Sequence, residues 1–294
     1  FFMLCFGLGA PVQSFPLLSV ALVLILLVLG HRLEKLPDEL KSFPRTIFHL
    51  MNITVLVFSV WALVQVSELM RQGGLLRHVA ALTFLGYCGI YLAHRMMGQR
   101  SVYMYLFSLF LMLGSLFIAG GLWSVDGCWL AAMAAAGVTL GVGTGLHREK
   151  GYNWCRHVYF CSAPIMLVSL ILSVGQWPFL ILALALASLL LWLAYARLAR
   201  AVEDVVGAAM GERVVAKCFF FGAVGLSVPI VPMVFLQASN LYVALAAILC
   251  GLTFSWIAWQ RRGQADKGAG YVLAALMFAS AGVLGLGRQV PGIA

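Results

Sequence analysis

Apolar segments of about 20 residues, the length that a helix needs to cross a bilayer, follow one another along the chain with short polar linkers between them. The pattern predicts ten membrane-spanning helices, at residues 14–31, 46–69, 77–97, 101–123, 127–146, 157–175, 177–199, 214–236, 239–260 and 268–288. Because the linkers leave no room for a soluble domain, we predict a single transmembrane domain over residues 1–294.

The composition agrees with a chain whose solvent is lipid. Hydrophobic residues make up 63% of the sequence and charged residues 10%, whereas soluble domains carry about 25% charged residues. The alternating segments of about 10 residues that are typical of a membrane β-barrel are absent from the sequence. The sequence therefore predicts an all-α, polytopic integral membrane helix bundle.

Lysine and arginine are distributed unevenly along the chain. Of the 19 basic residues, sixteen fall in or beside the first, third, fifth, seventh and ninth linkers, and three lie on the opposite side of the predicted spans. Short loops rich in lysine and arginine stay on the cytoplasmic side of a membrane. We therefore expect these basic linkers to face the cytoplasm and the protein to reside in a bacterial inner membrane, that is, the plasma membrane.

Histidine and arginine gather at span ends on this basic side. Five of the six histidines lie there, and four of them stand next to an arginine. The densest stretch is "LHREKGYNWCRHVYF" at 146–160, between the fifth and sixth spans. From this layer we select the candidate ligand-binding residues His49, His94, Arg95, His147, Arg156 and His157.

Three interpretations of this layer stay open. Basic side chains can anchor the helix ends among lipid headgroups without forming any site. Arginine, lysine and imidazole donors beside helix N-termini can instead bind a small anion. The third interpretation is a redox cofactor near the cytoplasmic face, either a haem b held by His49 and His94 or a quinone hydrogen-bonded to a histidine or tyrosine.

Acidic residues avoid the middle of every predicted span. The nearest are Glu68, close to the outer end of the second span, and Asp126, between the fourth and fifth spans. Proton pumps commonly carry carboxylates through the bilayer core, so this distribution speaks against such a pump. The sequence also lacks GxSxG, HExxH and paired DxxxD motifs and any CxxC pair. It therefore indicates neither an enzymatic activity nor a bound metal.

Helix-breaking residues interrupt two of the predicted spans. Pro229 and Pro232 lie near the middle of the eighth span, where each removes a backbone donor. The fifth span ends in "GVTLGVGTG", which contains Gly141 and Gly143. Such residues allow either close helix packing or an opened segment beside a solute. We select these four residues as candidate gating or pathway residues.

Together these features favour a multi-pass transporter or channel for a small anionic or polar solute, with a basic cytoplasmic vestibule and no cofactor. The alternative is the membrane anchor subunit of a respiratory or redox complex that binds quinone or haem b near the cytoplasmic face. The expected partners are the lipid bilayer and the solute, and no nucleic acid. A peripheral cytoplasmic subunit and a second copy of the chain are further candidate partners. The sequence does not identify the solute.

Overall fold

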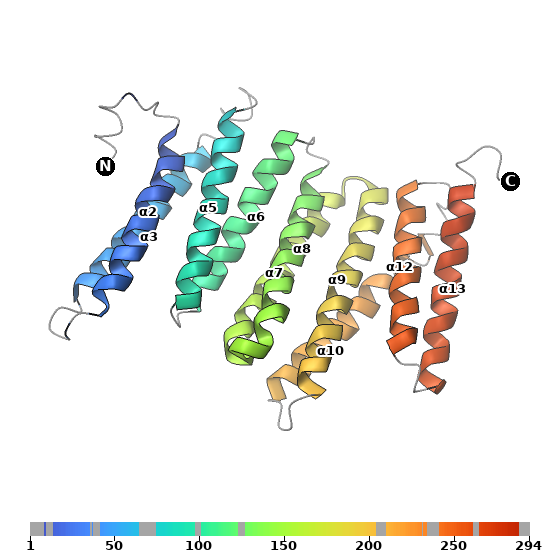
Figure 1. The fold of residues 1–294 in the computed structure, drawn as a ribbon. Coiled ribbons are helices and arrows are strands. Elements are labelled where there is room, and N and C mark those ends of the chain that lie inside the picture. Colours follow the sequence, from blue (N-terminus) through green and yellow to red (C-terminus); the bar gives the residue numbers. More distant parts are fainter. Residues whose placement is uncertain are drawn as a thin grey trace. The chain divides into compact units, whose positions relative to one another are not determined.

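The computed structural model describes residues 14–35, 42–64, 75–97, 101–122, 127–203, 210–230, 232–233, 241–260 and 265–287, together with Gly9 and Pro37. Ten helices are defined within these ranges (Figure 1). They are α2 (Phe15–Leu33), α3 (Ser42–Val64), α5 (Leu75–Met97), α6 (Val102–Leu122), α7 (Cys128–Lys150), α8 (Tyr152–Ser173), α9 (Trp177–Glu203), α10 (Met210–Ser227), α12 (Leu241–Gln260) and α13 (Ala265–Gly287).

The helices confirm the predicted fold class, an all-α, polytopic membrane helix bundle. Seven of them, α2, α3, α6, α7, α8, α9 and α12, are long and apolar enough to cross a membrane. Large apolar side chains on several of these helices are exposed, among them Leu56, Phe160 and Leu252, as expected where lipid rather than water surrounds the helices. The predicted crossings at α5, α10 and α13 are helical, and that these three helices span the bilayer stays a prediction.

The connection between α7 and α8 is much shorter than the sequence suggests. The predicted spans at 127–146 and 157–175 left a linker of ten residues, whereas the structure places only Gly151 between the two helices. Gly151 adopts φ 75°, a left-handed conformation that favours glycine. Its backbone N–H donates to the carbonyl oxygen of His147 over 2.9 Å, which closes the end of α7. His147 therefore lies in the last helical turns of α7, and Arg156 lies near the start of α8.

The helix of the eighth predicted span, at 214–236, is interrupted, and the extent of the span stays a prediction. Helix α10 ends at Ser227, and residues 228–229 form a turn. Proline lacks a backbone N–H and crowds the preceding turn, and the residue before it disfavours helical geometry. Helix α10 therefore ends before Pro229, residues 230 and 232–233 are helical again, and residues 231 and 234–236 lie outside the described residues.

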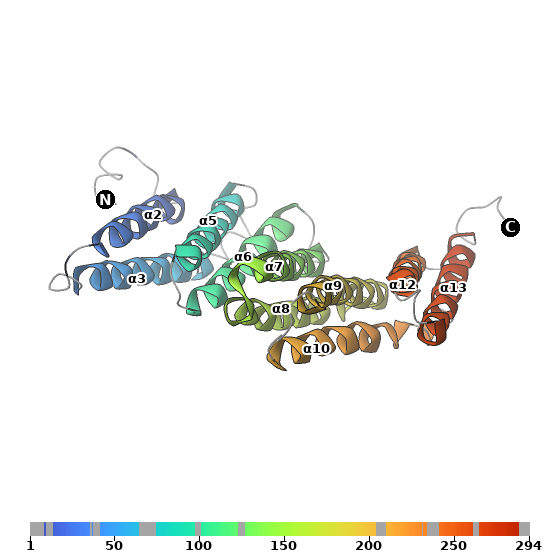
Figure 2. The same ribbon diagram turned by 60° about the horizontal axis from the view of Figure 1, so that its bottom comes forward.

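The chain divides into two compact units, residues 1–135 and residues 136–294. Whether they act as the single domain predicted from the sequence stays a prediction. In the first unit, unit 1, α2 packs against α3 and α5, and α5 packs against α6 (Figures 1 and 2). Glycines bring these helices close together, because a Cβ atom on Gly86 of α5 would lie 2.6 Å from Val20 Cγ1 of α2.

The second unit, unit 2, contains most of α7 and all of α8, α9, α10, α12 and α13. Helix α9 packs against α8, α10 and α12, and α12 packs against α13. A Cβ atom on Gly282 of α13 would lie 2.6 Å from Ile248 Cγ1 of α12, so glycine again sets the helix spacing. The fully buried indole of Trp192 lies in the core between α9, α10 and α12.

Candidate functional site

The predicted ligand-binding residues are divided between the two units. His49, His94 and Arg95 belong to unit 1, and His147, Arg156 and His157 belong to unit 2. His49 is exposed on α3, whereas His94 and Arg95 are buried near the end of α5.

Aromatic rings enclose His94 in unit 1. The centroid of its imidazole lies 3.9 Å from that of Tyr103, 4.8 Å from that of Phe48 and 5.2 Å from that of His31. We call these four residues the histidine–aromatic cluster. Within it, Nδ1 of His31 lies 2.9 Å from Oε2 of Glu34, one helical turn further along the chain.

The cluster depends on a close approach between α2 and α3. A Cβ atom on Gly30 would lie only 2.6 Å from Cε1 of Phe48, so the Phe48 ring occupies the space that a side chain at position 30 would fill. His49, the next residue along α3, is exposed. Consequently His49 and His94 do not share one buried space in unit 1.

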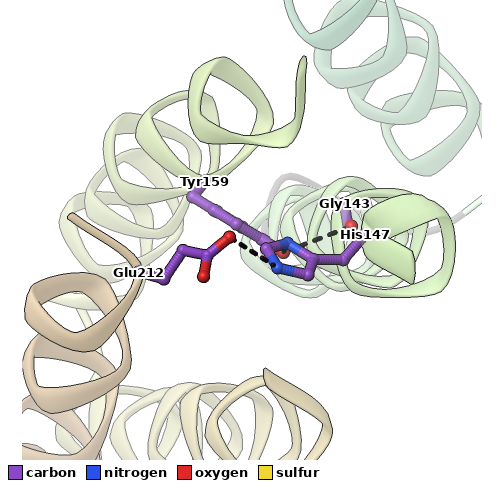
Figure 3. Close-up of polar contacts among 4 residues, drawn as sticks. All are labelled: Gly143, His147, Tyr159 and Glu212. Atoms are coloured by element: carbon purple, nitrogen blue, oxygen red, sulfur yellow. Dashed lines mark hydrogen bonds and ion pairs between the residues drawn. The ribbon is translucent and has the colours of Figure 1, made fainter. Parts of the chain in front are cut away.

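A different arrangement surrounds His147 in unit 2 (Figure 3). Nδ1 of His147 lies 3.0 Å from the hydroxyl oxygen of Tyr159 on α8, and this hydroxyl donates to the carbonyl oxygen of Gly143 over 3.2 Å. On the other side of the imidazole, Nε2 lies 3.5 Å from Oε1 of Glu212 on α10. We call the three side chains and the Gly143 carbonyl the His147 network.

Local sequence explains how α7 and α8 form this network. Gly143 and His147 are four residues apart and therefore share one face of α7. Gly143 has no side chain, and a Cβ atom there would lie 2.8 Å from Cε1 of Tyr159 and 3.1 Å from Cγ1 of Val158. The phenol ring can therefore lie directly against the backbone of α7 and reach its carbonyl oxygen.

The third helix of the network is positioned in a similar way. Gly211 packs against the ring of Tyr152, since a Cβ atom there would lie 2.8 Å from Cε1 of that ring. This contact holds the start of α10 against α8. Glu212 follows in the first turn of α10, where the helix dipole favours a carboxylate.

The side chains of the His147 network are largely buried. The side chain of His147 is 7% exposed and that of Glu212 14% exposed, and Tyr159 is buried. Tyr159 also packs edge-on against Phe219 of α10, with 5.4 Å between ring centroids. An imidazole, a phenol and a carboxyl group from three helices thus form one connected polar chain inside unit 2.

Arg156 and His157 lie outside the His147 network. Arg156 is exposed on α8, and its Nε donates to Nε2 of His157 over 3.2 Å. Of the six predicted ligand-binding residues, only His147 takes part in the network. Among the described residues, no group of three or more His, Cys, Asp and Glu side chains is placed to hold a metal ion.

The predicted gating residues have unequal surroundings. Gly143 belongs to the network, whereas a Cβ atom on Gly141 would meet no atom within 4 Å. Helix α7 is continuous through both glycines, which favours the packing interpretation of this segment over an unwound one. Pro229 and Pro232 are both exposed.

Sequence reasoning missed Tyr159 and Glu212. Glu212 lies two residues before the predicted start of the eighth span and therefore falls outside the predicted spans. The glycine directly before it and the tyrosines at 152 and 159, one helical heptad apart, are the signals that could have placed it in a packed helix.

Comparison with models of known protein families, with curated protein sequences and with solved structures finds no match for this chain. The fold alone therefore defines its class. It is a multi-pass α-helical integral membrane protein with seven candidate spans among the described residues.

Proposed function

We propose that this protein is a secondary transporter or channel for a small anionic or polar solute. The observation that carries the proposal is the His147 network, in which ionisable side chains from α7 and α10 meet inside unit 2 at 3.5 Å. Ionisable groups within a membrane domain are costly, and they are typically retained where they bind a solute or an ion.

The charge of the chain supports an anion as the solute. The formal net charge is +9, and basic residues concentrate in alternate linkers. In unit 1, Arg95 and His94 are buried beside each other at the end of α5. Guanidinium and imidazole groups bind carboxylates and inorganic anions through charge-assisted hydrogen bonds. We propose that, within each unit, the basic helix ends act as an entrance that attracts the solute from the cytoplasmic side.

The break after α10 supports movement during transport. Helix α10 ends at Ser227, residues 228–229 form a turn that includes Pro229, and residues 230 and 232–233 are helical again. Proline removes a backbone hydrogen bond, and such a position is where a helix can bend. We propose gating or pathway roles for Pro229, Pro232, Gly141 and Gly143 on this basis.

The redox alternative receives less support from the residues present. A bis-histidine haem requires two imidazoles that face the same iron, whereas His49 is exposed and His94 is enclosed by three aromatic rings. These two residues do not fit that cofactor as placed, and we derive no redox step. An absorption spectrum of the purified protein, oxidised and then reduced with dithionite, tests the alternative, since a Soret band that shifts would favour it.

Flux into liposomes tests the proposed function. Purified protein is reconstituted, and the entry of chloride, nitrate, phosphate and succinate is compared with entry into protein-free liposomes. We expect at least one anion to enter faster with the protein present, and its flux to fall in Arg95→Gln and Arg156→Gln. Lys217→Gln, which removes an exposed charge from α10, serves as the matched control. Absence of flux for every anion contradicts the proposal. Unchanged flux in both arginine variants would contradict a role for these basic residues in attracting the solute.

A further inference from the structure

We propose that His147 and Glu212 together hold one transferable proton, and that the proton is the coupling ion of transport. This inference rests on the proposed function, because it names the ion that would accompany the solute. It departs from the expectation drawn from the acidic residues, which spoke against a proton pump because none of them lies in the middle of a predicted span.

Counting hydrogens along the network leads to this inference. The hydroxyl of Tyr159 has a single hydrogen, which it donates to the carbonyl oxygen of Gly143 over 3.2 Å. The 3.0 Å contact between Tyr159 and Nδ1 of His147 then needs its hydrogen from the imidazole. In this arrangement Nδ1 carries a proton, and Nε2 faces Oε1 of Glu212 at 3.5 Å.

One proton between Nε2 and the carboxyl group completes the network. It can reside on His147, giving an imidazolium beside a carboxylate, or on Glu212, giving a neutral imidazole beside a carboxylic acid. Both forms have no net charge, which suits side chains that are 7% and 14% exposed. Loss of the proton to water leaves the pair with one negative charge in a poorly solvated place, which is unfavourable.

Loss of the proton also changes the contacts between helices. If the remaining hydrogen stays on Nδ1, two acceptors face each other and the link between α7 and α10 is lost. If it resides on Nε2, Tyr159 must turn its hydroxyl from the Gly143 carbonyl to Nδ1. In either case deprotonation alters how α7, α8 and α10 hold together, which is the property that coupling requires.

Few other charged groups share this environment. On α8, the titratable neighbours of Tyr159 are Cys155 and Tyr152, and on α10 the neighbour is Glu212. Glu149 and Lys150 at the end of α7, and Arg213 and Lys217 on α10, are exposed. The greater exposure of Glu212 compared with His147 makes its carboxyl group the side from which the proton enters and leaves.

Proton movement in liposomes tests the inference. The protein is reconstituted with a pH-sensitive dye inside the liposomes, and an inward gradient of the anion that gives the largest flux is imposed. We expect the interior to acidify as the anion enters. In Glu212→Gln and His147→Gln, acidification should fall to the level of protein-free liposomes while anion flux persists. Glu149→Gln, which removes an exposed carboxylate two residues from His147, should acidify like the wild type.

The outcomes separate this inference from the proposed function. Anion flux without acidification in the wild type overturns proton coupling and leaves the transporter proposal standing. Acidification that survives both Glu212→Gln and His147→Gln overturns the assignment of the proton to this pair. Absence of any anion flux overturns both proposals. Using two variants on different helices guards against one of them failing to fold.

Discussion

Two buried histidines occupy equivalent sequence contexts but different surroundings. His94 in unit 1 and His147 in unit 2 are each followed by an arginine, and each lies near the end of its helix. His94 contacts the rings of Phe48, Tyr103 and His31. His147 contacts a hydroxyl group and a carboxyl group.

The residue one turn earlier explains part of this difference. Position 90, four residues before His94, is a buried isoleucine, whereas position 143, four residues before His147, is glycine. Because Gly143 has no side chain, the Tyr159 ring can pack against the backbone there, and its hydroxyl group reaches the carbonyl oxygen of Gly143. The same pair of residues in the sequence therefore has different neighbours in the two units, because the helix faces that pack against it differ.

The largest effect is expected in the histidine–aromatic cluster. Phe48→Ala removes a buried ring that contacts His31 and His94 and packs on Gly30. We expect a loss of about 3 kcal/mol in the free energy of unfolding, as for other buried phenylalanines, measured by denaturation of the purified protein in detergent. Phe43→Ala, at a 57% exposed position on the same helix, is the matched control. Equal losses in the two variants would show that the cluster is not packed as described.

Replacing each histidine by phenylalanine sharpens the comparison. His147→Phe deprives Tyr159 and Glu212 of their shared partner, and we expect a loss of about 2 kcal/mol in the free energy of unfolding. His94→Phe keeps an aromatic ring beside Phe48, Tyr103 and His31, so the loss should be smaller. The same denaturation assay measures both variants. A larger loss for His94→Phe would reverse the distinction between the two sites.

Adding one methyl group to α7 tests the close approach of Tyr159. In Gly143→Ala the new Cβ atom would lie 2.8 Å from the Tyr159 ring, and overpacking of this kind costs about 1–2 kcal/mol. In Gly145→Ala no atom lies within 4 Å of the new Cβ, so stability should stay the same or rise slightly. Equal stability of the two variants in thermal unfolding would argue against the contact.

The smallest expected effect concerns two buried hydroxyl groups. Tyr159→Phe removes the hydrogen bond to Gly143, and Tyr91→Phe removes a 2.8 Å hydrogen bond to Oδ1 of Asn52 in unit 1. Each should cost about 1 kcal/mol in the free energy of unfolding. Acidification of liposomes during anion entry should be impaired in Tyr159→Phe alone. Equal impairment in Tyr91→Phe would argue that the effect is one of general stability.

The sequence predicts most of the fold because apolar segments of membrane-spanning length are a direct physical requirement of the bilayer. It does not predict the single-residue connection between α7 and α8, because the left-handed conformation of Gly151 depends on local backbone geometry. It selects His147 as a candidate from its residue type and position. It does not identify Tyr159 and Glu212, because their roles depend on which faces of α7, α8 and α10 pack together.

The central claim is that His147 and Glu212 act as a pair across α7 and α10, and a double-mutant cycle tests it most directly. The free energies of unfolding of His147→Gln, Glu212→Gln and the double variant are compared with that of the wild type. The structure predicts that the second substitution costs less once the first is present, with a coupling energy of about 1 kcal/mol or more, as for residues in direct contact. Additive losses in the free energy of unfolding would contradict the claim that His147 and Glu212 interact.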